Sequence, residues 1–92
     1  MPKYLFQATY TADGIKGLEK DKAAGRAAAV RSAVEALGGR VEAFYLAFGE
    51  HDVVVLADLP DNASATAFTL TVSKSRLLRT TTTPLLSVEE AD

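Results

Sequence analysis

The clearest pattern in the sequence is a pair of apolar runs on either side of a short polar turn. The runs cover residues 41–48 and 53–56, and the turn between them is Gly49-Glu50-His51-Asp52. The first run is rich in aromatic and β-branched side chains, and the second is apolar at every position. Such a pair predicts an antiparallel hairpin whose second strand is buried on both faces.

The first part of the chain predicts a strand followed by a helix. Residues 3–10 mix aromatic, apolar and polar side chains and end at a turn signal, which is typical of a strand. Apolar residues then recur every three or four positions from Asp21 to Leu37, which predicts a helix with Asp21 as its N-cap. Gly38-Gly39 suits the left-handed end of such a helix. Residues 15–18 predict no more than a short helical turn, because two glycines lie close together.

The segment after the hairpin has two competing patterns. Apolar residues alternate with threonines from Phe68 to Val72, as in a strand, whereas Ala65, Phe68 and Val72 also have helical spacing. We favour a helix over residues 61–74, because Asp61 is a suitable N-cap and the fold requires a crossover connection here.

The C-terminal part predicts one more strand and a tail. Residues 76–86 are rich in β-branched side chains, and Pro84, which has no N–H to donate, suits a strand at a sheet edge or the end of a strand. Residues 87–92 are acidic and are expected to form a loose tail.

The predicted order is strand, helix, strand, strand, helix, strand, in a single domain of residues 1–92. This is the βαββαβ plan of an α+β, ferredoxin-like fold. Right-handed crossovers give a four-stranded antiparallel sheet in the order 4-1-3-2, with both helices on one face. The other face of the sheet is then left open.

The apolar side chains on the open side of the predicted sheet suggest that a second copy of the chain covers it. Alternation along residues 41–48 gives two sets of side chains, and both sets are largely apolar. The sets are Phe44, Leu46 and Phe48 on one side, and Val41, Ala43, Tyr45 and Ala47 on the other. A solvated face would carry charges, so we expect a homodimer or a higher homo-oligomer in which two sheets meet face to face.

Composition excludes several classes of function. The 92 residues include 10 basic and 12 acidic side chains of scattered position, which argues against a nucleic-acid-binding surface. The absence of cysteine excludes disulfides and thiolate chemistry. No apolar run approaches the roughly 18 residues of a membrane span, and the N-terminus does not have the pattern of a signal peptide. We therefore expect a soluble, cytoplasmic protein that does not bind membranes.

Short motifs along the chain form a distinctive series. They are Tyr10-Thr11-x-x-Gly14-Ile15-Lys16, Gly38-Gly39, Phe44-Tyr45-x-x-x-Gly49-Glu50-x-Asp52-Val53-Val54-Val55 and Arg79-Thr80-Thr81-Thr82. The series resembles the GYD family of small bacterial and archaeal proteins over nearly the whole chain. The family signature at the hairpin is Gly-x-Tyr-Asp, and His51 stands here at the tyrosine position. The resemblance implies a ferredoxin-like fold related to dimeric α/β barrels, with a dimer, and it implies no reaction.

Two residues are candidates for proton transfer. His51 lies beside two carboxylates, and histidine suits a general base or a metal ligand near neutral pH; the alternative is a solvated hairpin tip. Tyr45 is a second catalytic candidate, and the alternative is a core tyrosine with a bonded hydroxyl. One histidine without cysteines or a ligand-spacing motif predicts no metal site, and no cofactor is expected.

Ligand binding has a separate set of candidates. Arg79 is suited to clamp a carboxylate or phosphate with help from the hydroxyl of Thr80 or Thr82, or else to pair with an acid at the sheet end. Alternation separates Arg79 and Thr81 from Thr80 and Thr82, so the four side chains cannot all line one pocket. The Asp52 carboxylate is expected either to bind a ligand or to accept hydrogen bonds from nearby backbone N–H groups of its own turn. The polar side chain of Gln7 is expected either to point into a cavity or to form a hydrogen bond with Thr9 or a water molecule.

Several charged residues are predicted to meet at one end of the sheet. We expect the 49–52 turn to lie where the first strand begins, with the end of the second helix close by. The residues expected to gather there are Lys3, Glu50, His51, Asp52, Lys74 and Arg76.

Three functions are consistent with these patterns. The favoured one is a homo-oligomeric protein that binds a small molecule or a partner in a pocket at the open sheet face. The alternatives are a small enzyme of dimeric α/β-barrel type acting on a small organic substrate, and a structural assembly module.

Overall fold

The computed structural model describes residues 1–47 and 49–92. Its elements are β1 (Lys3–Tyr10), α1 (Ala12–Ala36), β2 (Arg40–Leu46), β3 (Val53–Asp58), α2 (Asn62–Lys74), β4 (Leu78–Leu85) and α3 (Val88–Ala91). The strands form one antiparallel sheet in the order β2-β3-β1-β4. The predicted α+β, ferredoxin-like fold and its strand order are therefore confirmed. Phe48, which was predicted to belong to the second strand, lies outside the described residues.

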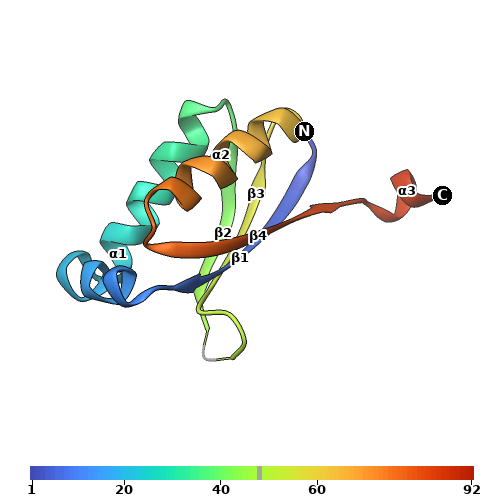
Figure 1. The fold of residues 1–92 in the computed structure, drawn as a ribbon. Helices are drawn as coiled ribbons and strands as arrows, with labels where there is room; N and C mark the ends of the chain where they lie inside the picture. Colours follow the sequence, from blue (N-terminus) through green and yellow to red (C-terminus); the bar gives the residue numbers. More distant parts are fainter. Residues whose placement is uncertain (48) are drawn as a thin grey trace.

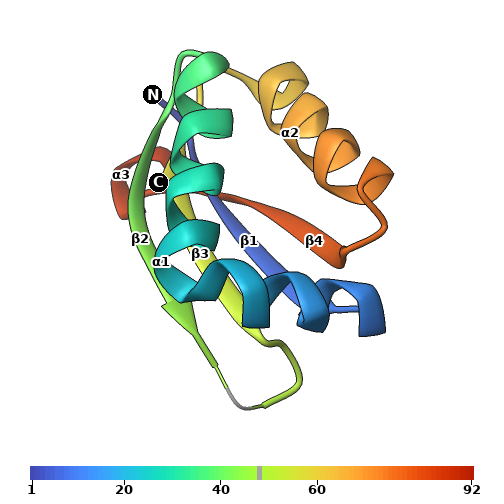
Figure 2. The same cartoon turned by 90° about the vertical axis from the view of Figure 1, so that its left-hand side faces the viewer.

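Both long helices pack on the same face of the sheet (Figures 1 and 2). The aromatic rings of Phe6 and Phe68 meet edge to face in the core, with their centroids 4.9 Å apart. On β3, alternate residues are buried against the helices, whereas Val54 and Leu56 on the opposite side are half-exposed. The prediction that this strand is buried on both faces is therefore wrong for a single copy, because the helices cover one face. The buried apolar core consists of Tyr4, Phe6, Ala8, Val34, Val53, Val55, Ala57, Leu59, Ala65 and Phe68.

α1 begins well before the predicted start at Asp21. Thr11 is its N-cap, and the Thr11 hydroxyl accepts a hydrogen bond from the N–H of Gly14 at 3.1 Å. The helix bends at Lys22, where φ is 62° and ψ is 173°. Residues 15–18 thus belong to a longer helical segment and not to an isolated turn. Gly14 is required in the first turn, because a Cβ there would lie 1.9 Å from the carbonyl oxygen of Leu77.

α1 ends at the glycine pair, as predicted. The N–H groups of Gly38 and Gly39 donate to the carbonyls of Glu35 and Val34 at 2.9 and 3.0 Å. Gly38 has a φ of +83°, which lies in the left-handed region that glycine adopts without a steric penalty. These two hydrogen bonds satisfy carbonyl groups that the end of a helix otherwise leaves without a partner.

The ambiguous segment after the hairpin is helical, as predicted. The Asp61 carboxylate accepts a hydrogen bond from the N–H of Ser64 at 2.8 Å, and this bond holds the pKa of Asp61 below its ordinary value. Ala65 and Phe68 are buried against the sheet, whereas Leu70 is 58% exposed. The cap at Asp61 therefore identified the element correctly where periodicity alone did not.

A β-bulge in β2 changes which side chains share a face. Val41 pairs with Ala57 and Ala43 pairs with Leu56, so one extra residue lies between the two pairs. Val41 is consequently on the helix side together with Phe44, and not on the side of Tyr45 as strict alternation predicted. A bulge adds one residue to a strand, and this addition reverses the alternation.

The C-terminal residues form an edge strand and a short exposed helix. β4 is an edge strand, which confirms the prediction from Pro84. Residues 87–92, which were expected to form a loose tail, include the short helix α3, where Ser87 and Glu90 form a capping box with reciprocal hydrogen bonds of 3.0 Å. Figure 1 shows α3 projecting beyond the sheet. We call residues 86–92 the C-terminal arm.

Candidate functional site

The face of the sheet opposite α1 and α2, which we call the open face, has an apolar centre. Strand pairing places Leu5 opposite Leu56, and Val54 between Gln7 and Tyr45. All of these side chains are half-exposed or exposed in a single copy. The open face includes Leu5, Gln7, Thr9, Ala43, Tyr45, Val54, Leu56, Arg79, Thr81 and Thr83.

A polar patch lies on the β1–β4 side of the open face. Arg79 pairs with Thr9, and Thr81 pairs with Gln7. The Thr81 hydroxyl donates to the carbonyl of Gln7 at 3.3 Å. Arg79 is exposed and makes no ion pair with another described residue. Of the predicted ligand-binding residues, Gln7 and Arg79 therefore lie together, with a guanidinium that is accessible to an anion.

The two threonines that were predicted to bind a ligand, Thr80 and Thr82, face the helices. Thr80 pairs with Ala8 and Thr82 pairs with Phe6, both of which belong to the core. The hydroxyl groups of Thr82 and Thr69 are 2.5 Å apart and form a hydrogen bond. Thr80 Oγ1 is buried and has no hydrogen-bond partner within the described structure. The prediction that the hydroxyl of Thr80 or Thr82 assists Arg79 is therefore wrong, because strand alternation puts both hydroxyls on the opposite face from Arg79.

Tyr45 lies on the edge strand β2, where it is 67% exposed. The alternative prediction of a core tyrosine is thus wrong, because the helices cover the opposite face. Three strand spacings, or about 14 Å, separate β2 from β4, which carries Arg79. One copy of the chain therefore does not bring Tyr45 and Arg79 together.

The 49–52 turn lies at the end of β1, not at its start as predicted. The Asp52 carboxylate accepts a hydrogen bond from the N–H of Tyr10 at 2.9 Å, and the N–H of Asp52 donates to Ala8 at 2.8 Å. Asp52 thus holds the turn against β1, which is the structural alternative that the sequence left open. His51 is half-buried, and its Nδ1 atom is buried without a hydrogen-bond partner among the described residues.

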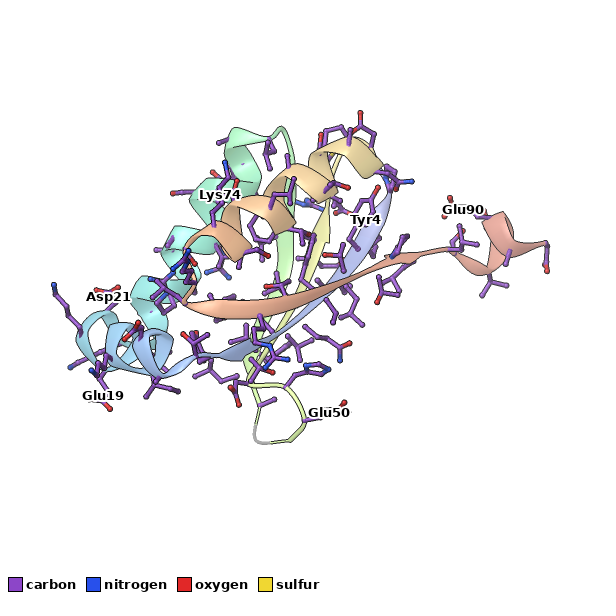
Figure 3. The ribbon with its side chains drawn as sticks, viewed as in Figure 1. Tyr4, Glu19, Asp21, Glu50, Lys74 and Glu90 are labelled. Carbon is purple, nitrogen blue, oxygen red and sulfur yellow. The ribbon has the colours of Figure 1, made fainter. Side chains whose placement is uncertain are left out.

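The charged residues expected to gather at this turn do so only in part, because the end of α2 and the start of β4 lie at the same end of the sheet as the turn and Lys3 does not. Figure 3 shows Glu50 at the outer end of the turn and Lys74 on α2, well apart. Arg76 lies near the end of β1, where its carbonyl accepts a hydrogen bond from the Thr11 hydroxyl at 2.8 Å. Lys3 is at the opposite end of the strand, because β1 and β3 are antiparallel and Lys3 pairs with Asp58.

Lys3 instead belongs to an ionic cluster that the sequence did not predict. Its Nζ lies 2.8 Å from Asp58 Oδ1 and 2.6 Å from Glu42 Oε2, and Arg40 Nη2 lies 3.5 Å from Asp58 Oδ2. The hydrogen bond from Lys3 holds the pKa of Asp58 below its ordinary value and raises the pKa of Lys3. Asp58 is buried, with 7% of its surface exposed. Because its members come from β1, β2 and β3, the cluster joins these strands at one end of the sheet.

Replacing Asp58 with asparagine should lower stability in a pH-dependent way. A carboxyl group whose pKa is lowered by folding stabilises the folded state above its unfolded pKa of about 4, and this stabilisation is lost as the pH falls through the folded value. We expect Asp58→Asn to cost about 1 kcal/mol near pH 7, since the partner side chains are exposed. Urea denaturation at several pH values should show the difference shrinking below about pH 4. A difference of constant size down to about pH 2 would contradict this role.

A cavity of about 180 Å³ lies on the other side of the sheet, between α1 and α2. We call it the helix-side cavity. Its lining is mostly apolar and includes Thr80 and Arg26. Burial raises the pKa of Tyr10, and the nearby charge of Arg26 partly opposes this shift. The apolar spacing of residues 21–37 predicted a helix, and it did not predict this space.

Two further features bear on chemistry. The described residues contain no group of three or more histidine, aspartate or glutamate side chains that is arranged to hold a metal ion. In the same part of the chain, no helix combines the length and the apolar content needed to cross a membrane.

Comparison with known proteins identifies the family. A family model described as the GYD domain matches residues 4–92. The chain belongs to the GYD family. This GYD domain is also similar to a solved structure described as "crystal structure of FFRP-DM1", with 15% sequence identity and a TM-score of 0.61 over 94% of this chain and 100% of that chain. At that identity the similarity supports the fold alone, and a search of curated proteins found no match.

Proposed function

We propose that this GYD domain is a homodimeric binding protein, in which a second copy covers the open face and a small anionic ligand binds between the copies. The observation that supports the proposal is the apolar centre of that face. Leu5, Val54 and Leu56 lie side by side there, and both long helices occupy the opposite face. Contiguous apolar surface of this kind is typical of an interaction site.

A stable dimer buries more area than the open face provides, which suggests a second contact region. Four strands spaced about 4.8 Å apart and about 20 Å long present roughly 400 Å² of flat surface. Stable interfaces bury about 800 Å² per partner, so the open face alone is small. The C-terminal arm carries Leu86 and Val88, which are 71% and 80% exposed. A partner subunit that received this arm would bury both side chains.

If the two copies are related by a two-fold axis parallel to the strands, acidic residues of one copy lie near a basic residue of the other. Such an axis lays β4 of one copy over β2 of the other, because these are the two edge strands of the sheet. The arm, with Glu89 and Glu90, follows the end of β4 that lies level with Arg40 on β2. The side chain of Arg40 is 76% exposed. The acidic arm of one copy would then meet the partner subunit's Arg40.

The same axis assembles the predicted site residues across the interface. Tyr45 and Thr81 lie in one row across the open face, at its two opposite edges. The partner subunit's Tyr45 would therefore lie over Thr81, next to Gln7 and Arg79. A guanidinium with an amide, hydroxyl groups and a tyrosine ring around it suits a small carboxylate or phosphate compound.

Arg79 is the residue with which to test the ligand. Inorganic phosphate or citrate should raise the melting temperature of the wild-type protein, and Arg79→Ala should abolish that increase. Arg31→Ala is the matched control, since Arg31 is exposed on α1, on the other side of the sheet. Differential scanning fluorimetry measures all three proteins. Equal stabilisation of Arg79→Ala and wild type, or no stabilisation by either anion, would show that Arg79 does not form this site.

A further inference from the structure

The helix-side cavity has the size and the lining of a separate ligand site. Its volume is about 180 Å³, and its walls come from both long helices and from three of the strands. An apolar cavity of about 150 Å³ stays dry and accepts a benzene ring. The helix-side cavity therefore has room for one ring or one branched chain with a small polar substituent.

Two polar groups of the lining have unused hydrogen-bonding capacity. Thr80 Oγ1 is buried and has no partner among the described residues, which is unfavourable unless a ligand or water supplies one. The Arg26 guanidinium contacts the Asp21 carboxylate at 3.3 Å, a long distance for a charge-assisted hydrogen bond. Arginine has five N–H donors, so this contact leaves several for another acceptor.

We propose that the helix-side cavity binds a small monocarboxylic acid, with its apolar body against Phe6 and Phe68 and its carboxylate at Thr80 and Arg26. The hydroxyl of Thr80 donates to one carboxylate oxygen, and the guanidinium supplies charge-assisted hydrogen bonds. The apolar walls select a compact body, such as a phenyl ring or a branched alkyl chain. This site lies across the sheet from Arg79, so it does not depend on the function proposed for the open face.

Isothermal titration with benzoate and 3-methylbutanoate tests the site in the full chain. At least one acid should bind with a Kd of about 1 mM or tighter. Ala29→Leu should weaken that binding at least tenfold, because Ala29 lines the cavity and a larger side chain occludes it. Ala28→Leu is the matched control, since Ala28 is also exposed on α1 but is not part of the lining. Its affinity should equal that of the wild type.

Two threonine variants separate the role of the hydroxyl from general damage to the fold. Thr80→Val keeps the shape of the side chain and should weaken acid binding about tenfold, without lowering the melting temperature of the free protein. Thr82→Val removes the hydrogen bond to Thr69 and should lower the melting temperature while the affinity stays unchanged. The proposal is wrong if neither acid binds saturably up to about 10 mM, or if Ala28→Leu and Ala29→Leu have the same affinity.

Discussion

Replacing Leu56 with glutamate should convert the proposed dimer into a folded monomer. Leu56 lies in the centre of the open face, between Leu5 on β1 and Ala43 on β2. Two-fold symmetry would place two such carboxylates in one interface, and each uncompensated buried charge costs several kcal/mol. We therefore expect the dimer dissociation constant to rise more than about 1000-fold, which corresponds to about 4 kcal/mol. Sedimentation velocity over a range of concentrations measures this change.

Leu70→Glu is the matched control for this substitution. Leu70 is an exposed leucine on α2, on the other side of the sheet. Its replacement introduces the same charge and should leave the association unchanged. Circular dichroism should confirm that both variants are folded. If Leu56→Glu associates as tightly as Leu70→Glu, the open face is not the interface.

Replacing Gly14 with alanine should have the largest effect on stability. The new Cβ would lie 1.9 Å from the carbonyl oxygen of Leu77 and 3.0 Å from Tyr10 Cδ1. The Leu77 carbonyl also accepts the hydrogen bond from the N–H of Thr11 at 3.0 Å, so it cannot move freely. We expect a loss of about 3 kcal/mol or more in the free energy of unfolding. Thermal denaturation should show a melting temperature at least about 10 °C lower.

Gly17→Ala is the matched control for Gly14→Ala. Both glycines lie in the first segment of α1, and a Cβ at Gly17 would meet no atom within 4 Å. Alanine is the better helix former, so this change should raise the free energy of unfolding by about 0.5–1 kcal/mol. Destabilisation of similar size by the two substitutions would mean that helix propensity, and not the contact with Leu77, explains the effect at Gly14.

Local signals were sufficient to predict the architecture. The Asp61 cap and the Gly38-Gly39 pair mark helix ends through hydrogen bonds that involve neighbouring residues, so their effect can be predicted without the tertiary structure. The apolar hairpin and the final strand with Pro84 then leave few topologies open. Chain connectivity and right-handed crossovers were enough to order the four strands correctly.

The errors have a common physical origin in contacts between distant parts of the chain. The first segment of α1 has two glycines, and Gly14 is needed because the distant Leu77 carbonyl approaches the helix closely. The bulge in β2 reversed the predicted side of Val41, and no local pattern marks it. Antiparallel pairing of β1 with β3 places Lys3 beside Asp58 and away from His51. The spacing of residues along the sequence does not show which distant residues come into contact.

The candidate site was predicted less well than the fold. Alternation correctly separated Arg79 from Thr80 and Thr82, because it depends on strand geometry alone. Grouping Tyr45 and His51 with Arg79 required knowledge of strand positions, and a single copy places Tyr45 and Arg79 on opposite edges of the sheet. The helix-side cavity depends on how α1 and α2 diverge above the sheet. No pattern in the sequence predicts the relative placement of these two helices.

Everything proposed for the open face requires that another copy covers its half-exposed Leu5, Val54 and Leu56. The most direct measurement is the mass of the 92-residue chain in solution, by light scattering after size-exclusion chromatography over a range of loading concentrations. We expect twice the chain mass of 9.8 kDa. A mass of one chain at every concentration would contradict the account.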